Sequence, residues 1–240
     1  MTSGVTTPTI EERAKLVRAS FLFNELEPRL ISEIAATSRL RALDKGAILF
    51  QQGDPGDALF IVVEGLVRIA VMSQAGKELT LGFMEPGDVF GEIALLDGLP
   101  RTASAAAALR SVLLTIERRT FLDLIAREAR LAQHVIELLC ERLRFDVDRV
   151  AEDAFLNLKA RLAKRLDALG IAHGRTIEGG IKIDLRLSQS ELAQMLGVSR
   201  EAVNKQLKAW GAEGLLRWER GYITLLDRNR LVDLYRQGEG

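Results

Sequence analysis

The chain has 240 residues, 48% of them hydrophobic, so it is long enough for one or two domains and can bury a core, which excludes a disordered protein. Lys plus Arg number 33 and Asp plus Glu also number 33. This neutral total conceals a basic C-terminal part, because residues 155–240 contain 15 Lys and Arg against 10 Asp and Glu, which favours a polyanionic partner for that part alone.

Cysteine and histidine are too scarce for most metal chemistry. Cys140 is the single cysteine, which excludes an internal disulfide and an iron–sulfur cluster held by four thiolates. His134 and His173 are expected to be polar surface groups on a helix and a loop, and no metal site is predicted. The sequence has no leader-like start and no apolar run near the roughly 18 residues of a membrane span, so we expect a cytoplasmic protein with no membrane partner.

The first half of the chain changes from helical to strand-like patterns. Residues 1–20 are expected to form an N-terminal tail, and Pro28–Ser38 a short helix with proline in its first turn. From Arg41 to Glu117, short apolar runs alternate with glycine-containing turns, which predicts an antiparallel sandwich or barrel. The expected strands are residues 47–50, 58–63, 66–72, 79–83 and 112–116.

Residues 90–103 carry the most specific pattern, a short apolar helical turn between a Gly-Glu pair and a Pro-Arg-Thr-Ala run. The backbone N–H groups that open the turn after Gly91 can point at a phosphate. Arg101 can bind the same phosphate through its fork of donors, while Glu92 can accept a ribose hydroxyl and Thr102 can add a hydroxyl contact. The alternative is a surface ion pair of Glu92 with Arg101 that closes an ordinary turn. The predicted ligand-binding residues here are Gly91, Glu92, Ile93, Ala94, Arg101 and Thr102.

A helical pattern of roughly thirty residues follows, from Thr120 to Asp153. Apolar residues recur along it at alternating spacings of four and three, which is a heptad seam along which two copies of the helix can pair. The stripe can also pack onto its own domain, and we favour the dimer. Asp146 interrupts the seam, where a carboxylate needs a partner. The predicted dimer contacts are Ala132, Ile136, Leu139, Leu143 and Val150.

Beyond a hinge expected near Asp153, the pattern predicts a second domain. A helix is expected over Ala154–Leu169, then a glycine-rich loop over Ile171–Gly180 and a short strand at Ile181–Ile183. The last expected element is a hairpin over Leu215–Leu226 that turns near Arg220 and Gly221.

Between that strand and the hairpin, residues 188–208 have the pattern of a helix-turn-helix. Ser188 and Glu191 form a capping box at the start of the first helix. Gly197 stands where the turn needs a positive φ, and Ser199 caps the second helix.

The residues after the second cap share one outward face and match the chemistry of base edges. Arg or Lys can bind guanine acceptors, Glu can accept from the cytosine amino group, and Asn can pair with adenine. The alternative is a structural helical hairpin with a solvated charged face. The hairpin residues Arg217, Trp218 and Arg220 can act as a wing on the DNA backbone. The predicted DNA-binding residues are Ser199, Arg200, Glu201, Asn204 and Lys205.

In this order, the two motifs resemble those of the cyclic-AMP receptor protein and fumarate–nitrate regulator (Crp/Fnr) superfamily of bacterial transcription factors, over roughly residues 22–225. The resemblance implies an α+β chain: an N-terminal antiparallel β-roll, which is the cyclic-nucleotide-binding jelly roll, then a long dimerisation helix and a C-terminal winged helix-turn-helix. The implied domains are residues 21–118, 119–153 and 154–240. The chain is closer to the nucleotide-binding branch, because the iron–sulfur branch requires cysteines that are absent.

The resemblance also implies roles for single residues. Arg142 matches an arginine of the dimerisation helix near the ligand, and Arg200, Glu201 and Lys205 match the base-reading positions. Where the family's cyclic-AMP site has threonine then serine on the long helix, this chain has Asp146 then Val147. An ionised Asp146 can accept from the amino group of adenine or from the N1–H and amino groups of guanine, so cyclic AMP and cyclic GMP both stay open. Lys205 in place of arginine and Gln206 in place of a branched apolar residue are further departures.

We therefore expect a homodimeric, cyclic-nucleotide-responsive transcription regulator that binds a palindromic operator and is not an enzyme. Cyclic AMP, or cyclic GMP, is the expected effector, and RNA polymerase is an expected partner through the loop at residues 172–179. One alternative is a regulator of the same fold that works without ligand. The other is a cyclic-nucleotide-binding regulatory subunit that acts on a protein partner.

Overall fold

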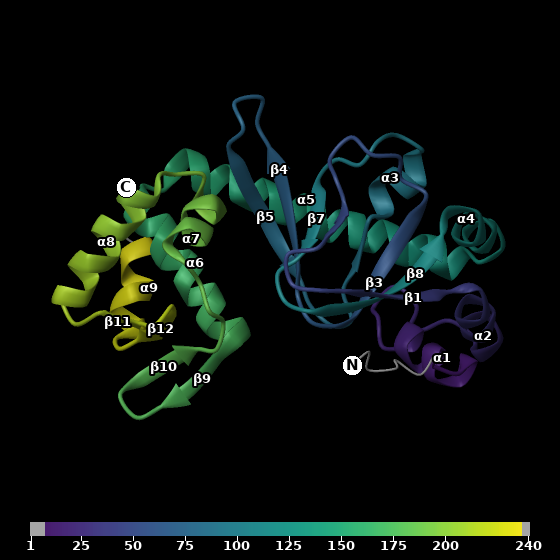
Figure 1. Cartoon of the computed structure of the whole chain (residues 1–240), viewed down its shortest axis with the longest axis horizontal. Coiled ribbons are helices and arrows are strands. Elements are labelled where there is room, and N and C mark those ends of the chain that lie inside the picture. The colour runs from purple at the N-terminus through teal and green to yellow at the C-terminus, as the bar shows by residue number, and fades with distance from the viewer. Residues whose placement is uncertain (1–7, 237–240) are drawn as a thin grey trace. The chain divides into compact units, whose positions relative to one another are not determined.

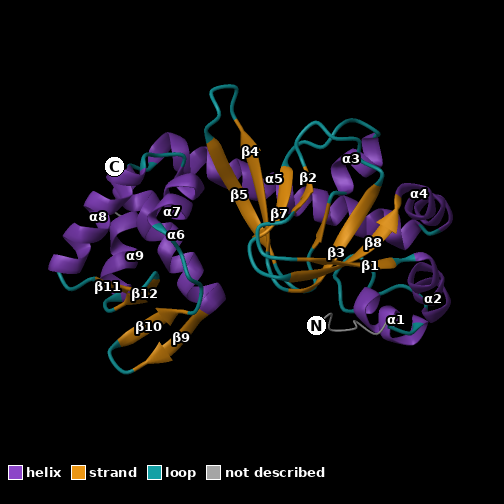
Figure 2. Cartoon of the chain, viewed as in Figure 1, coloured by secondary structure: helices purple, strands orange, loops and turns teal. Residues whose placement is uncertain are grey.

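The computed structural model describes residues 8–236, and the chain divides into two compact units (Figure 1). One unit comprises residues up to 77 together with 81–142, and the other comprises residues 78–80 together with 143 onward. Helices and strands are mixed in both units (Figure 2).

The first unit contains two four-stranded sheets, in the orders β1-β8-β3-β6 and β2-β7-β4-β5, and the strand pairs with a defined register are antiparallel. This confirms the predicted antiparallel β-roll. Five of its strands follow the expected apolar runs, whereas β1, β6 and β7 were missed. The strands are β1 (Arg39–Leu43), β2 (Ile48–Phe50), β3 (Ala58–Glu64), β4 (Val67–Met72), β5 (Glu78–Met84), β6 (Val89–Phe90), β7 (Ser104–Ala107) and β8 (Ser111–Glu117).

The N-terminal residues are more ordered than a tail. Residues 1–7 lie outside the described part, but α1 (Ile10–Arg18) starts at a capping box in which the Thr9 side chain accepts from the Glu12 backbone N–H. Helix α1 packs on α2 (Pro28–Thr37). Val17 of α1 is fully buried in a core that includes residues of β3 and β8. The tail predicted over residues 1–20 is therefore wrong from residue 10 onward.

The helical region after β8 consists of two helices, α4 (Arg118–Arg127) and α5 (Ala129–Phe155), rather than the single helix predicted over 120–153. Glu128 between them has an extended backbone with φ −123° and ψ 96°. His134 on α5 is buried, with Nδ1 3.3 Å from the carbonyl oxygen of Leu22, so its prediction as a surface group is also wrong. The Phe21 ring, from the N-terminal segment, lies against His134, a contact that the sequence did not predict.

The second unit packs helices against a small antiparallel sheet of order β11-β12-β10-β9. Within this unit, α5 ends at Phe155, two residues beyond the hinge predicted near Asp153, and the Asn157 side chain caps α6. Strand β9 and helix α9 were not predicted. The elements are α6 (Leu158–His173), β9 (Gly174–Ile177), β10 (Gly180–Ile183), α7 (Gln189–Leu196), α8 (Arg200–Ala212), β11 (Leu216–Glu219), β12 (Tyr222–Leu225) and α9 (Arg228–Arg236).

Candidate functional site

The Gly-Glu motif opens a short helix, α3 (Glu92–Asp97), directly after β6. Gly91 adopts φ +85°, and a Cβ there would lie 2.8 Å from Nη1 of Arg101, so only glycine fits both the backbone and the space. Gly56 permits the neighbouring turn to approach α3, because a Cβ at that position would lie 2.2 Å from the Cβ of Ala94. The glycines thus bring the 53–57 turn, α3 and Arg101 together in one place.

Arg101 is 4% exposed and lies inside the β-roll. Its Nη1 donates to the carbonyl oxygen of Gly91 at 2.8 Å and its Nη2 to that of Ala58 at 2.7 Å. The guanidinium lies over the Phe50 ring, 4.3 Å from the ring centre, and also faces Phe60. Burial lowers the pKa of the Arg101 guanidinium, and nearby carboxylates, Asp57 foremost, oppose that shift. Nε is buried and has no hydrogen-bond partner among the described residues, which leaves donor capacity for an anion.

Glu92 is 1% exposed and forms an ion pair with Arg142, with 2.8 Å between Oε1 and Nη1. Arg142 also donates to the carbonyl oxygen of Val89, so it links α5 to the start of β6. Burial raises the pKa of the Glu92 carboxyl, and Arg142 is the strongest group that opposes this rise. The second oxygen, Oε2, is buried without a hydrogen-bond partner among the described residues, which is costly unless a donor reaches it.

The structure therefore brings four predicted site residues together in the first unit. Arg101 donates to Gly91, and Arg142 donates to the adjacent Glu92. Ala94 is buried, whereas Ile93 and Thr102 are exposed. Asp146 is exposed and belongs to the second unit, so its role as a ligand contact stays a prediction.

The helix-turn-helix has the caps that the sequence predicts. The Ser188 side chain accepts from the backbone N–H of Glu191, whose carboxylate accepts from that of Ser188. Gly197 ends α7 with φ +65°, and the Ser199 side chain accepts from the backbone N–H of Ala202. The buried face of α8 holds Val203, Leu207 and Trp210.

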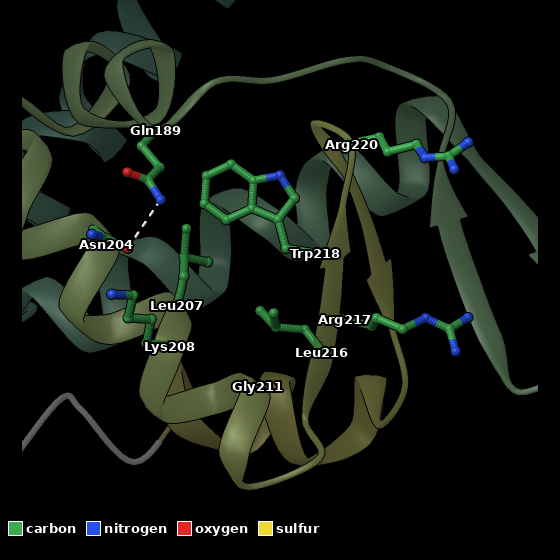
Figure 3. Close-up of a pocket in the computed structure, with 9 residues that line it drawn as sticks. All are labelled: Gln189, Asn204, Leu207, Lys208, Gly211, Leu216, Arg217, Trp218 and Arg220. Atoms are coloured by element: carbon green, nitrogen blue, oxygen red, sulfur yellow. Dashed lines mark hydrogen bonds between the residues drawn. The ribbon is translucent and has the colours of Figure 1, made fainter.

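The opposite face of α8 is open to solvent. Arg200, Glu201 and Lys205 are exposed, and Asn204 is half-buried. The hairpin β11–β12 turns at Arg220, with φ 53°, and Gly221, with φ 86°, as predicted. A groove of about 450 Å³ lies between α8 and this hairpin (Figure 3), lined by Gln189, Asn204, Leu207, Lys208, Gly211, Leu216, Arg217, Trp218 and Arg220.

Helix α5 carries an exposed apolar stripe that differs slightly from the predicted seam. Leu139 packs partly against the core of its own unit, and Ala132 is half-buried. Large apolar side chains stay exposed at Ile136 (60%), Leu143 (65%) and Val150 (69%). At about 100° per residue, Cys140 and Val147 fall on the same stripe within roughly 40°, and both are exposed.

Metal clusters and membrane-spanning helices are both absent from the described residues. Within residues 8–236, no group of three or more His, Cys, Asp or Glu side chains is placed to hold a metal ion. No helix in that range is long and apolar enough to cross a membrane.

Two family models match the chain, one to each unit's principal domain. The cyclic nucleotide-binding domain matches residues 40–128, which include α3, Glu92 and Arg101. The Crp-like helix-turn-helix domain matches residues 160–234, which include α7, α8 and the β11–β12 hairpin.

Relatives match this chain over most of its length. The CRP-like cAMP-activated global transcriptional regulator of Mycobacterium tuberculosis is 33% identical over 219 residues, which cover 90% of this chain and 96% of the relative. The cyclic AMP receptor protein of Thermus thermophilus is 32% identical over 221 residues, 91% of this chain and 98% of the relative. Among solved structures, the c-di-GMP responsive global regulator CLP of Xanthomonas campestris has a TM-score of 0.76 at 26% identity, covering 84% of this chain and 100% of that one.

Proposed function

The chain belongs to the Crp/Fnr family of transcription regulators, which are not enzymes, and from this premise we propose that it is a cyclic-AMP-responsive, homodimeric regulator of a palindromic operator. The observation that carries the effector proposal is the arrangement of Glu92 and Arg101 around α3. Each presents a buried polar atom without a partner among the described residues, one an acceptor and one a donor.

Those two atoms fit the two ends of a ribose cyclic phosphate. A ribose hydroxyl donates to Oε2 of Glu92, which removes the cost of an unsatisfied buried oxygen. The phosphate takes the remaining donor capacity of Arg101 and neutralises a cation whose burial is unfavourable. Thr102, exposed beside Arg101 in the chain, adds a hydroxyl to the phosphate end. Ion pairing with Arg142 opposes the rise in the pKa of Glu92 that burial causes, and so favours the ionised carboxylate, which can accept.

The purine end is where the effector's identity is decided. We assign this end to Asp146, whose carboxylate accepts from the amino group of adenine. Guanine offers two donors to a carboxylate, so cyclic GMP is the second candidate effector. The relatives from Mycobacterium tuberculosis and Thermus thermophilus are both named for cyclic AMP, which favours that nucleotide.

For the DNA end, we propose that two copies of the chain pair along the stripe Ile136, Cys140, Leu143, Val147 and Val150 of α5. The two α8 helices then enter major grooves about one helical turn apart, ~34 Å. Nucleotide binding shifts the equilibrium between arrangements of the paired α5 helices. It thereby favours the arrangement in which both α8 helices fit an operator. Such a protein works on the chromosome, in the cytoplasm, together with RNA polymerase.

The test is a calorimetric titration of cyclic AMP, cyclic GMP and c-di-GMP into wild type, Arg101→Ala and Arg101→Lys. We expect cyclic AMP to bind wild type most tightly and to lose affinity strongly with alanine. Lysine keeps the charge without the fork of donors and should fall between. The matched control, Arg110→Ala, removes an exposed arginine of the same unit and should bind as wild type does.

The outcomes separate the rival functions. If no nucleotide binds wild type, the effector half of the proposal fails and a regulator that works without ligand replaces it. If a nucleotide binds but no operator DNA is retained in a gel-shift assay, a regulatory subunit that acts on a protein partner replaces the DNA half.

A further inference from the structure

Two side-chain amides from different helices of the helix-turn-helix are hydrogen-bonded to each other, and both line the groove beside α8. Gln189 is the first residue of α7 after its cap, and Nε2 of Gln189 donates to Oδ1 of Asn204 on α8 at 3.0 Å (Figure 3). The Ser188 capping box fixes the start of α7 and therefore the position from which the Gln189 side chain reaches α8.

The direction of this hydrogen bond decides what Asn204 offers to DNA. A primary amide has an acceptor oxygen at one end and a donor NH₂ at the other. Because Oδ1 of Asn204 points at Gln189, its Nδ2 lies on the opposite edge of the amide plane, as Figure 3 shows. Asn204 is one turn beyond Arg200 on the face that α8 leaves open, and Nδ2 is the polar group of the amide that the hydrogen bond with Gln189 does not use.

The surroundings hold the amide pair in this arrangement. Both amides are half-buried, and Leu207, Leu216 and Trp218 line the groove beside them with apolar surface. Leu207 and Leu216 carry no side-chain polar group that could compete for the hydrogen bond between Gln189 and Asn204. Asn204 is therefore restrained before any DNA arrives, which lowers the entropy lost when it binds.

We propose that Gln189 is a positioning residue for base recognition, which orients Asn204 as a hydrogen-bond donor and so selects against cytosine at one operator position. In the major groove, guanine, adenine and thymine each present an acceptor, whereas cytosine presents only its amino donor. The proposal rests on the DNA binding by α8 proposed above. It replaces the simpler expectation that Asn204 recognises adenine alone.

The experiment selects operator sequences from a randomised half-site library with the full-length protein and cyclic AMP. Asn204→Ala identifies the position that Asn204 reads, because the bias against cytosine should disappear there and nowhere else. Gln189→Ala should reduce the same bias by about tenfold or more, the size of one lost base contact, while other positions keep theirs. Ser190→Ala, an exposed neighbour in the same turn of α7, is the matched control and should keep the full bias.

A second variant, Gln189→Glu, should turn the Asn204 amide around, whereas Gln189→Ala leaves that amide without a partner. The carboxylate in Gln189→Glu can only accept, so Asn204 must donate Nδ2 to it and present Oδ1 instead. The favoured bases should then be those with an amino donor, cytosine and adenine. A glutamate in the first turn of α7 is favourable to the helix, so this variant is expected to fold. Its extra negative charge lowers affinity for every sequence alike, and only the ranking of bases is compared.

The outcomes are distinct from failure of the proposed function. If wild type selects an operator but Gln189→Ala keeps the full bias, or Gln189→Glu keeps the wild-type ranking, Gln189 does not position Asn204 and the inference is wrong. It is also wrong if Asn204→Ala changes the base preference at no position. If wild type itself selects no sequence, the DNA-binding proposal fails first.

Discussion

Glu92 and Arg142 form an ion pair of 2.8 Å that links α3 to α5 across fifty residues of sequence. The carboxylate is buried and the guanidinium is partly exposed, so the pair joins the interior of the β-roll to its surface. A group bound at Glu92 would therefore be linked through Arg142 to α5, the helix whose apolar stripe we propose as the dimer contact. We propose this connection as the route by which occupancy of the candidate site influences association of two chains.

The first prediction concerns pH and Glu92. Because burial raises the pKa of this carboxyl, the folded chain binds more protons there than the unfolded chain does. The stability from this group is fully present below its ordinary pKa of 4.5 and is lost as pH rises through the folded value. The free energy of unfolding of wild type minus that of Glu92→Gln should therefore fall as the pH rises above about 4.5. Urea denaturation at a series of pH values measures it. A difference that grows with pH contradicts the prediction, and Glu64→Gln, at an exposed glutamate of the same unit, is the matched control.

The second prediction separates backbone strain from crowding at two glycines. Gly91 and Gly76 both have positive φ, +85° and +74°, but a Cβ at Gly76 would meet nothing within 4 Å. Gly76→Ala should therefore destabilise the chain by roughly 1 kcal/mol, the strain of alanine at positive φ. Gly91→Ala adds a clash with Nη1 of Arg101, so it should cost more and also weaken cyclic-AMP binding. Denaturation and calorimetry test this, and equal losses for both variants would contradict it.

Much of the candidate site was predictable because its signals are local. A glycine at positive φ, a capping serine and a Gly-Glu pair before a short apolar turn act within a few residues, so α3 and the start of α8 follow from their own sequence. The outward positions of Arg200, Glu201 and Lys205 also follow from helical spacing and are confirmed.

What the sequence did not predict depends on contacts between distant residues. The aromatic environment of Arg101 comes from Phe50 and Phe60, which are separated from it by forty residues or more and carry no motif. The burial of His134 depends on the N-terminal segment that folds over it. Strand β6 has two residues, too few for an alternating pattern.

The third prediction concerns a second buried carboxylate, Asp167 on α6. Asp167 is 5% exposed, and it accepts from Nε of Arg228 at 2.6 Å and from the hydroxyl of Tyr235 at 3.0 Å, both on α9. Asp167→Ala removes the acceptor of both bonds and should lower the free energy of unfolding of the C-terminal unit by about 1–3 kcal/mol. Asp233→Ala, an exposed acid of α9, should change it by less than about 0.5 kcal/mol. Urea denaturation of the full chain measures both, and similar effects would show that the Asp167 contacts contribute little.

The fourth prediction concerns base recognition by Glu201, which is exposed in the first turn of α8. If its carboxylate accepts from a cytosine amino group, Glu201→Ala should reduce discrimination at one operator position by roughly 1–3 kcal/mol. Phosphate contacts are untouched, so the dependence of affinity on salt should keep its slope. Fluorescence anisotropy with single-base operator variants over a salt series measures both quantities. An unchanged preference would remove Glu201 from the base-contacting residues.

The last prediction tests the stripe on α5 against a matched apolar residue of the same helix. Leu143 is 65% exposed and lies on the stripe, whereas Phe145 is 49% exposed and points away from it by about 160°. A buried, unpaired carboxylate is costly, so Leu143→Glu should convert the dimer to monomers, while Phe145→Glu leaves it intact. Sedimentation equilibrium measures the association state. Because neither side chain is buried in the single chain, both variants should keep the wild-type circular-dichroism spectrum, which separates lost pairing from lost folding. Dimers that persist in Leu143→Glu, or dissociate equally in Phe145→Glu, would place the interface elsewhere.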